Sequence, residues 1–428
     1  MKRILLVGGG GALQTRLRAL APGIATAVIC RASILYRVPR PQENDAVLAL
    51  SDDAPAASWI AGARYIDAQW PVDAVATLAE IDQDKAVGIA EALGLPFHSA
   101  ETMEAVHDKT AMRKMLRDKG LDDLPNARLN GLSDLERFYE RHGPPLLLKP
   151  GRGRGSAGVA IVRDRDDLEG AYATAARAEA PRLEPSPPVV ERFVEGPEFS
   201  VEMVSHDGVH YAFAVTEKFT DPRTRLELGH VVPARIAEDD RDRMLARVRA
   251  SLTGLGVASG ITHTEVILGG PERTPVLIET HLRHAGDDIP ELVHGATGVD
   301  MVELFLRQTA GEDLASVPEL IERAGAPLYS AAQAIWFVTG DRRGTLERIE
   351  GLREAAESAS VVAVDQLIDD GAPCPEPVHS FARLASVRVH AADADTAIDA
   401  ARANAALLKP VIAPEADGPE GRTRPAHS

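Results

Sequence analysis

Residues 260–293 read GITHTEVILGGPERTPVLIETHLRHAGDDIPELV, and the rest of the chain is best interpreted from this stretch outward. Two segments in it, residues 261–268 and 276–283, alternate in polarity and are rich in β-branched side chains. Between them lies GGPERT, residues 269–274, a run of turn-forming residues. Alternating segments separated by such a turn predict a β-hairpin.

A symmetric turn in this hairpin places two glutamates face to face. It pairs Glu265 with Glu279 and His263 with His281, and the alternation of side chains puts all four on one face of the sheet. Carboxylates directly opposite each other lie roughly 5 Å apart at Cβ and repel unless a cation sits between them. Carboxylate oxygens suit Mg²⁺. The face is therefore either a metal site or an ordinary charged, solvent-facing side of an antiparallel sheet, and the remaining sequence has to decide.

The composition is that of an ordinary globular protein. The chain has 428 residues, 45% of them hydrophobic and 26% charged, which suits roughly two to four domains. A net charge of −17 argues against a nucleic-acid partner, so a bound phosphate would need a local basic pocket. Cys30 and Cys374 are far apart in sequence, which predicts buried thiols in a reducing cytoplasm rather than a disulfide or a zinc site. No apolar run reaches the length of a membrane span, so no membrane partner is expected.

The first 107 residues predict a small open α/β domain. An apolar strand at residues 4–7 leads into four glycines and a helical segment at residues 12–20. This start resembles a dinucleotide-binding motif, but Leu13 stands where the third glycine is required, which counts against a dehydrogenase. The alternation continues with strands at residues 25–30 and 46–49, a helix at 72–93 and a Leu-Pro strand after it.

A glycine-rich loop is the second informative feature. The apolar strand 146–148 delivers Lys149, and PGRGRGSAG (150–158) leads into another strand at 159–162. Residues 153–158 match G-x-G-x-x-G, but a strand rather than a helix follows, and the ending of a P-loop is missing. The loop predicts a flap whose backbone N–H groups fold over phosphates, with a flexible surface hairpin as the other interpretation.

Further helices and strands follow the same kind of pattern. Asp108 is the expected N-cap of a helix that begins at Lys109. Up to residue 310, the other expected elements are helices at 166–180, 240–255 and 301–308, and strands at 189–202, interrupted by a turn, and at 211–215. From residue 311, the expected elements are strands at 330–338, 360–364 and 385–389, and helices at 345–356 and 393–408.

In this order, the features resemble the ATP-grasp superfamily of carboxylate–amine ligases. The resemblance is carried by LLLKPGRGRGSAGV (146–159), VVERFVEGPEFSVE (189–202) and HTEVIL…PVLIETHLR (263–283). THTEVIL, VTEKF and LGHVVPA make the L-amino-acid ligases, which join two amino acids, the most similar branch. The implied fold is an ATP-grasp fold, of class α/β and α+β. It has an N-terminal open α/β domain (1–107) and an ATP-grasp core (108–310), in which residues 145–195 include a mobile ATP lobe. A C-terminal α+β cap (311–412) and a disordered tail (413–428) follow.

The resemblance implies which residues bind ATP. Lys109 and Lys149 contact the phosphates, Lys149 also lying near the base, and the glycine flap with Gly153, Gly155, Ser156 and Gly158 closes over the triphosphate. The segment between the two lobes, Glu191, Arg192, Phe193 and Val194, presents its backbone to adenine. Glu198 accepts the ribose hydroxyls.

The resemblance also assigns the metal ions and the reacting carboxyl. Glu265 and Glu279 hold two Mg²⁺ ions, for which Mn²⁺ can substitute, and Arg283 lies beside the reacting carboxyl, so Lys149 and Arg283 are the implied catalytic residues. Many ATP-grasp enzymes have Glu-x-Asn where this chain has Glu279-Thr280-His281. Imidazole is a poor Mg²⁺ ligand. His281 therefore faces substrate, leaves one metal ion more loosely held, or is a satisfied structural histidine.

The implied activity is ATP-dependent ligation. The carboxylate of an amino acid is activated as an acyl phosphate and joined to an amine, giving a dipeptide or related amide, ADP and phosphate; the alternatives are a ligase for another acid or amine and a non-catalytic ATP-binding module. Lys218 and His230 are either substrate contacts, together with His281, or a solvated lysine and a strand-end histidine. The expected partners are small-molecule substrates in the cytoplasm, with a homodimer left open.

Overall fold

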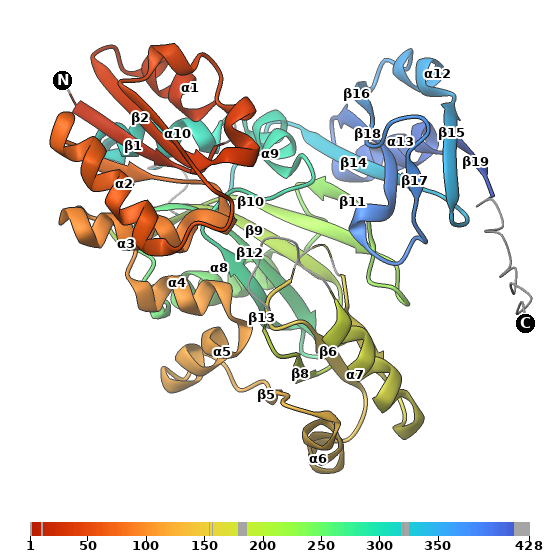
Figure 1. Cartoon of the computed structure of the whole chain (residues 1–428). Helices are drawn as coiled ribbons and strands as arrows, with labels where there is room; N and C mark the ends of the chain where they lie inside the picture. Colours follow the sequence, from red (N-terminus) through yellow and green to blue (C-terminus); the bar gives the residue numbers. More distant parts are fainter. Residues whose placement is uncertain are drawn as a thin grey trace, which may run out of the picture.

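The structure is a computed structural model that describes residues 2–9, 12–153, 155, 157–178, 186–317, 320 and 325–414. Ser156 of the glycine loop and residues 415–428 of the predicted tail lie outside the described residues. Figure 1 shows an N-terminal part, a lobe that carries the glycine loop, and a C-terminal part, all arranged around a long central sheet. Among the described residues, no helix is long and apolar enough to cross a membrane.

The N-terminal part is an open α/β unit, as predicted. Its strands are parallel and lie in the order β3-β2-β1-β4. β1 and β2 are nearly continuous apolar runs, as expected of parallel strands covered on both faces. The elements are β1 (Lys2–Val7), α1 (Leu13–Leu20), β2 (Ile24–Arg31), β3 (Ala46–Leu50), α2 (Ala56–Gln69), β4 (Ala74–Ala76) and α3 (Gln83–Leu93).

The helix predicted over residues 72–93 is wrong in its first half. Residues 74–76 form β4 and pair in parallel with β1, and α3 begins only at Gln83. A short apolar run fits a helix or a strand equally well, and here the pairing with β1 decides. The Leu-Pro strand predicted after this helix is also wrong, because residues 95–99 form no regular element and a proline cannot donate to a ladder.

The central sheet is antiparallel, with strand order β13-β12-β9-β10-β11-β14-β18-β16. Its strands are β9 (Glu198–His206), β10 (Val209–Thr220), β11 (Glu227–Val232), β12 (Gly260–Gly269), β13 (Thr274–His281), β14 (Ala332–Thr339), β16 (Val361–Gln366) and β18 (Arg383–Ala391). The helices that pack around it are α4 (Ala100–His107), α5 (Lys109–Asp118), α8 (Glu238–Gly254), α9 (Ile289–Thr297) and α10 (Met301–Ala310).

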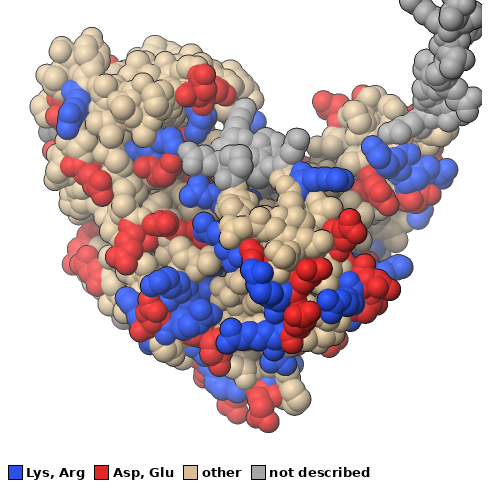
Figure 2. Space-filling view, turned by 60° about the horizontal axis from the view of Figure 1, so that its bottom comes forward, with Lys and Arg blue, Asp and Glu red and all other residues tan. Residues whose placement is uncertain are grey.

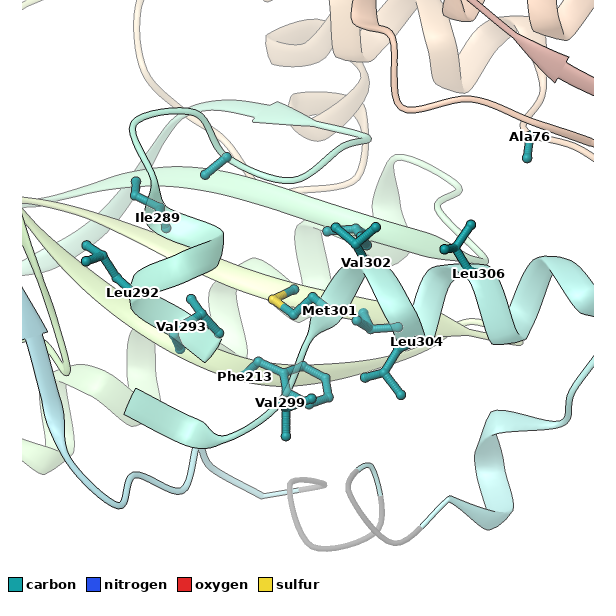
Figure 3. Close-up of a cluster of buried hydrophobic side chains, with 14 of the residues drawn as sticks. Ala76, Phe213, Ile289, Leu292, Val293, Val299, Met301, Val302, Leu304 and Leu306 are labelled. Atoms are coloured by element: carbon teal, nitrogen blue, oxygen red, sulfur yellow. The ribbon is translucent and has the colours of Figure 1, made fainter. Parts of the chain in front are cut away.

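One hydrophobic core joins the central sheet to the N-terminal part. Figure 3 shows side chains of α9 and α10 lying against Phe213 of β10, and the same cluster continues to Ala76 of β4. Ile4 and Leu6 of β1 also belong to it. This shared core fixes the loop that follows β4 relative to the central sheet, and that loop contributes to the site described below.

The lobe that carries the glycine loop is a small antiparallel sheet in the order β5-β8-β6-β7. The loop joins β6 to β7, which are antiparallel, so the predicted connection between two strands is confirmed. Leu146, Leu148 and Val190 pack against two helices to form the core of the lobe. Its elements are β5 (Asn126–Arg128), α6 (Leu132–His142), β6 (Leu146–Lys149), β7 (Ala160–Val162), α7 (Leu168–Arg177) and β8 (Val189–Arg192).

The C-terminal part is built onto the central sheet. β14, β18 and β16 extend that sheet beyond β11, so the sheet continues across the boundary predicted at residue 310. The remaining elements are β15 (Gly344–Glu350), α12 (Leu352–Ala356), β17 (Pro373–Cys374), α13 (Ala394–Ala405) and β19 (Lys409–Ala413), with strand order β17-β15-β19.

The helix predicted over residues 345–356 is also largely wrong. Residues 344–350 form β15, whose buried positions Gly344, Leu346 and Ile349 face inward while their charged neighbours are exposed. Pairing with β19 satisfies its backbone. Only residues 352–356 are helical.

On the described part of the face that Figure 2 shows, Lys and Arg are interspersed with Asp and Glu.

The hairpin of β12 and β13 has the predicted register. Glu265 pairs with Glu279 and His263 with His281. The turn itself is displaced, since Gly269 pairs with Thr274, and a β-bulge next to Glu265 compensates for the displacement. The two glutamates therefore face each other because of a bulge that the alternating pattern did not reveal.

Candidate active site

A cavity of about 130 Å³ lies between the lobe and the central sheet. It brings together most of the predicted nucleotide and metal residues, which come from five separate segments of the chain. Those in its wall are Lys109, Lys149, Gly153, Gly155, Glu191, Arg192, Phe193, Val194, Glu198, Glu265 and Glu279. Gly158 lies outside the wall: its φ is +77°, and a Cβ there would lie 2.3 Å from the Cβ of Ala178, so it serves the turn.

The wall also offers an apolar slot. Leu147 and Val159 come from the lobe, and Ile267, Leu277 and Ile278 come from the hairpin. Flat apolar ligands favour such linings when a few polar groups fix their orientation. The cavity thus has an apolar end and a charged end.

One face of the central sheet forms the charged end. The pairings Glu279–Glu265–Ser200, across β13, β12 and β9, make one row of polar side chains. A second row is His281–His263–Glu202. The side chains of Glu265 and Glu279 are 15% and 17% exposed, so the solvent-facing interpretation of this face is wrong.

A buried ion cluster joins the lobe to helix α5. Lys149 Nζ lies 2.7 Å from Glu191 Oε2, and Arg113 Nε donates to Glu191 Oε1 over 3.1 Å. Burial raises the pKa of Glu191, but the charges of Lys149 and Arg113 outweigh it and lower that pKa to about 2. Burial lowers the pKa of Lys149, with Glu191 opposing it. Sequence reasoning missed Arg113, although its place four residues after Lys109 puts the two on one helix face.

Both predicted metal carboxylates are in contact with lysines. Lys109 Nζ lies 2.5 Å from Glu279 Oε2. Lys218 Nζ pairs with Glu265 and lies 2.7 Å from Oε1 of Glu227. Burial opposes both lysine charges, yet the surrounding carboxylates raise the pKa of each lysine. Lys218 is therefore not the solvated lysine that the sequence left open, and its partners are protein carboxylates.

Two histidines lie one step further along the hairpin, stacked with ring centroids 5.9 Å apart. His281 Nε2 lies 3.1 Å from Glu279 Oε1, and its Nδ1 lies 3.1 Å from Glu80 Oε1. His263 Nε2 lies 3.4 Å from Glu265 Oε1, and its Nδ1 lies 3.0 Å from Glu202. Burial lowers both pKa values, but the carboxylates raise that of His263 to about 9 and also raise that of His281. His281 is a buried and fully hydrogen-bonded side chain.

Arg283 is not among the described residues that line the first cavity. Its Nε donates to Oε2 of Glu80 over 3.0 Å, and its Nη1 donates to the carbonyl of His284 over 2.8 Å. Glu80 lines a second cavity of about 60 Å³. This cavity shares Lys109, Gly153 and Glu279 with the first, so the two meet where phosphates and metal are predicted. Sequence reasoning missed Glu80, since it falls in the part of the predicted helix 72–93 that lies before α3 and is not α-helical.

His230 belongs to a cluster that adjoins Lys218 through their common neighbour Glu227. Its Nε2 lies 3.2 Å from Oδ2 of Asp287, and Arg383 of β18 pairs with that carboxylate over 2.8 Å and with Glu227 over 2.8 Å. His230 is fully buried, so it is not an exposed strand-end residue. Among the described residues, Nδ1 of His230 and Nε of Arg383 are buried without hydrogen-bond partners.

In the segment between the lobes, residues 191–194, two of the backbone N–H groups expected to contact adenine are already hydrogen-bonded. The N–H of Arg192 donates to the carbonyl of Pro125, and the N–H of Phe193 donates to that of Pro145, over 3.0 and 3.1 Å. These two donors are therefore not free for a base. Val194 is the next residue of the segment, it lines the cavity, and it becomes the candidate donor.

Comparison with known proteins gives the family. Residues 142–291 match the ATP-grasp domain, and residues 336–413 match the L-amino acid ligase C-terminal domain 2. D-alanine–D-alanine ligase of Anaeromyxobacter sp. (strain Fw109-5) is 30% identical over 247 residues, which are 55% of this chain and 72% of that protein. Alanine–anticapsin ligase of Bacillus subtilis (strain 168) is 27% identical over 252 residues, 55% of this chain and 53% of that protein. The chain spans about half the length of the first curated relatives it matches.

The fold agrees with these matches. The crystal structure of L-amino acid ligase from Bacillus licheniformis superposes with a TM-score of 0.80 at 23% identity, covering 96% of this chain and 99% of that one. The chain belongs to the ATP-grasp family, and the predicted ATP-grasp fold is confirmed. Its C-terminal part is of the L-amino acid ligase type, as the resemblance implied.

Proposed function

We propose that the protein is an ATP-dependent carboxylate–amine ligase that activates the carboxylate of an amino acid as an acyl phosphate and joins it to an amine. The products are a dipeptide or related amide, ADP and phosphate. The observation that carries this proposal is the meeting of the two cavities at Lys109, Gly153 and Glu279, which puts a nucleotide site and a small polar site on either side of the same charged groups.

ATP fits the first cavity by the chemistry of its wall. The apolar slot suits the adenine base, and the carboxylate of Glu198 suits the ribose hydroxyls. Lys149 Nζ is buried and lies 2.7 Å from Oε2 of Glu191. An ammonium has three N–H donors, so a phosphate oxygen could accept from one that does not point to Glu191. Gly153 and Gly155 allow the loop backbone to approach the triphosphate closely.

Mg²⁺ fits the facing carboxylates. Glu265 and Glu279 supply hard oxygen donors from adjacent strands, and their pKa values lie below the ordinary range because neighbouring cations outweigh burial. A bound Mg²⁺ would offset the charge that develops on the phosphoryl oxygens. The role of the protein is to keep both carboxylates ionised and facing each other. Lys109 and Lys218 balance their charges when no nucleotide is bound.

The second cavity is the proposed place of the reacting carboxylate. An acid bound there would direct an oxygen at the γ-phosphorus from the opposite side of Lys109, Gly153 and Glu279. Attack forms a bond from that oxygen to phosphorus and releases ADP. The amine then attacks the acyl carbon, and phosphate leaves. Arg283, held near this cavity by Glu80, is the proposed donor to the tetrahedral oxyanion, and the glycine loop is the proposed barrier to water.

The substrates are proposed from the named relatives. The named relatives are ligases of alanine, D-alanine and L-amino acids, which supports amino acids as substrates here. His230 stays a proposed substrate contact, since its Nδ1 has no partner in the described structure, whereas Lys218 is reassigned to holding Glu265. Cytoplasmic location and a homodimer also stay proposals.

The test is a screen of amino-acid pairs with ATP and Mg²⁺. Phosphate release is measured for each pair, and the masses of the products are determined. A pair-dependent release with a product lighter by one water than the sum of the two amino acids is expected. Release with some other acid, but with no pair of amino acids, would overturn dipeptide formation and favour a ligase for another carboxylate. Full activity of Glu279→Gln would refute the metal assignment.

A further inference from the structure

A chain of hydrogen bonds runs from the predicted metal site to the N-terminal part. Its members are Glu279, His281, Glu80 and Arg283, called here the Glu80 network. His281 lies 3.1 Å from each of its two glutamates, and Arg283 Nε and Nη2 lie 3.0 and 2.9 Å from Oε2 of Glu80. All four side chains are at most one-fifth exposed. The network therefore links a proposed metal ligand to the proposed oxyanion donor.

Carboxylates lie on both sides of the His281 ring. Its Nε2 lies 3.1 Å from Oε1 of Glu279, and its Nδ1 lies 3.1 Å from Oε1 of Glu80. Both ring nitrogens of His281 are therefore occupied by protein carboxylates. Its cross-strand neighbour His263 is arranged alike, between Glu265 and Glu202, so each proposed metal carboxylate is held by its own histidine.

We propose that His281 is not a metal ligand but a positioning residue, which aims Glu279 at the metal and, through Glu80, holds Arg283 beside the reacting carboxyl. This inference rests on the proposed function. Glu80 is supplied by the turn at Glu80–Asp82, which follows β4, so the N-terminal part contributes to the site directly. An asparagine at this position would carry both of its N–H donors on one nitrogen, whereas the imidazole has a nitrogen on each side of the ring, one facing each carboxylate.

The wild-type protein offers a direct test with Mn²⁺ as the probe. Mn²⁺ and ADP are added, and pulsed electron paramagnetic resonance measures the coupling of the ion to nearby nuclei. We expect ³¹P coupling from ADP and no coupling from a directly bound ¹⁴N. A strong ¹⁴N coupling that disappears in His281→Ala would overturn the inference, because it would identify His281 as a ligand. Absence of any Mn²⁺–ADP binding would refute the proposed function, and the inference with it.

Two variants separate the two ends of the network. His281→Ala should weaken Mn²⁺ binding in the presence of ADP by roughly 10–100-fold, the usual effect of losing the partner of a metal ligand. Glu80→Gln should lower kcat about tenfold or more while the Mn²⁺ affinity stays within about threefold, because its main loss is the orientation of Arg283. An unchanged Mn²⁺ affinity in a folded His281→Ala protein would overturn the positioning role.

A matched control is available on β9. His206 Nε2 lies 3.0 Å from Oδ1 of Asp313, so it is also a histidine paired with a carboxylate, but it lies outside both cavities. His206→Ala should leave the Mn²⁺ affinity and kcat unchanged. Equal losses in His206→Ala and His281→Ala would mean that the effect is a general loss of structure, and the inference would fail.

Discussion

Glu191 holds two buried cations of the nucleotide site, and neutralising it gives a quantitative test of that arrangement. Its carboxylate is 3% exposed and contacts Lys149 Nζ at 2.7 Å and Arg113 Nε at 3.1 Å. Glu191→Gln keeps the shape of the side chain but removes the counter-charge of Lys149 and leaves Arg113 with Asp122, at 3.5 Å, as its partner. Strand β8 carries Glu191 and pairs with β6, which carries Lys149, so these two strands should show the damage.

The size of the effect follows from the pKa of Glu191. A carboxyl whose pKa is lowered from 4.5 to about 2 has its charged form stabilised by ~3 kcal/mol in the folded state. Breaking a buried ion pair by removing one partner typically costs about 3–5 kcal/mol, which agrees. Because the folded pKa is the lower one, this stability is present above pH 4.5 and is lost as the pH falls towards 2.

Hydrogen exchange measured by mass spectrometry reports the loss where it occurs. A loss of ~3 kcal/mol should speed the exchange of β6 and β8 amides about 100-fold at neutral pH. Glu140 in the same lobe is 60% exposed and pairs with Arg165 at 3.3 Å, so Glu140→Gln is the control and should change exchange by less than about threefold. Exchange in Glu191→Gln within threefold of the wild type would refute the assignment of the buried cluster.

Three further substitutions address the rest of the site. Arg283→Lys should lower kcat by roughly 10²-fold, because one positioned oxyanion donor is lost, while the KM for ATP stays within about threefold. Steady-state kinetics measure both constants, and a change in KM alone would contradict this role. Lys218→Met leaves a cluster of buried carboxylates together, so Tm should fall and CaCl₂ should raise it more than in the wild type; equal rises in a melting experiment would contradict that cluster. Gly196→Ala places a Cβ 2.1 Å from the carbonyl oxygen of Leu268 and should lower Tm, whereas Gly170→Ala, with open space around it, should not.

The sequence predicted those parts of the site that depend on local pattern. Alternation and turn residues predicted the hairpin, and the pairing of Glu265 with Glu279 is confirmed. The strand before the glycine loop and the placement of Lys149 at its end depend on adjacent residues only, and they too agree with the structure. The roles of these residues in binding nucleotide and metal stay predictions.

What the sequence did not reveal comes from distant segments. Glu80 is 201 residues from His281, and no local pattern connects them. The short strand β4 falls inside a predicted helix, because three residues carry too little periodicity to identify a strand. Arg383, 156 residues from Glu227, is likewise visible only after β18 has joined the sheet.

The continuity of the central sheet bears on how such a chain can be divided and recombined. β11, which lies before the boundary at residue 310, pairs with β14, which lies after it, through four residue pairs in the described structure. Cutting the chain there would uncover the backbone donors and acceptors of β11 and create an edge prone to aggregation. Arg383 would leave with the same fragment, and Glu227 and Asp287 would lose their shared counter-charge. In evolution, as in the laboratory, exchange of C-terminal parts between relatives should therefore succeed only where both sides of this strand pair are inherited together.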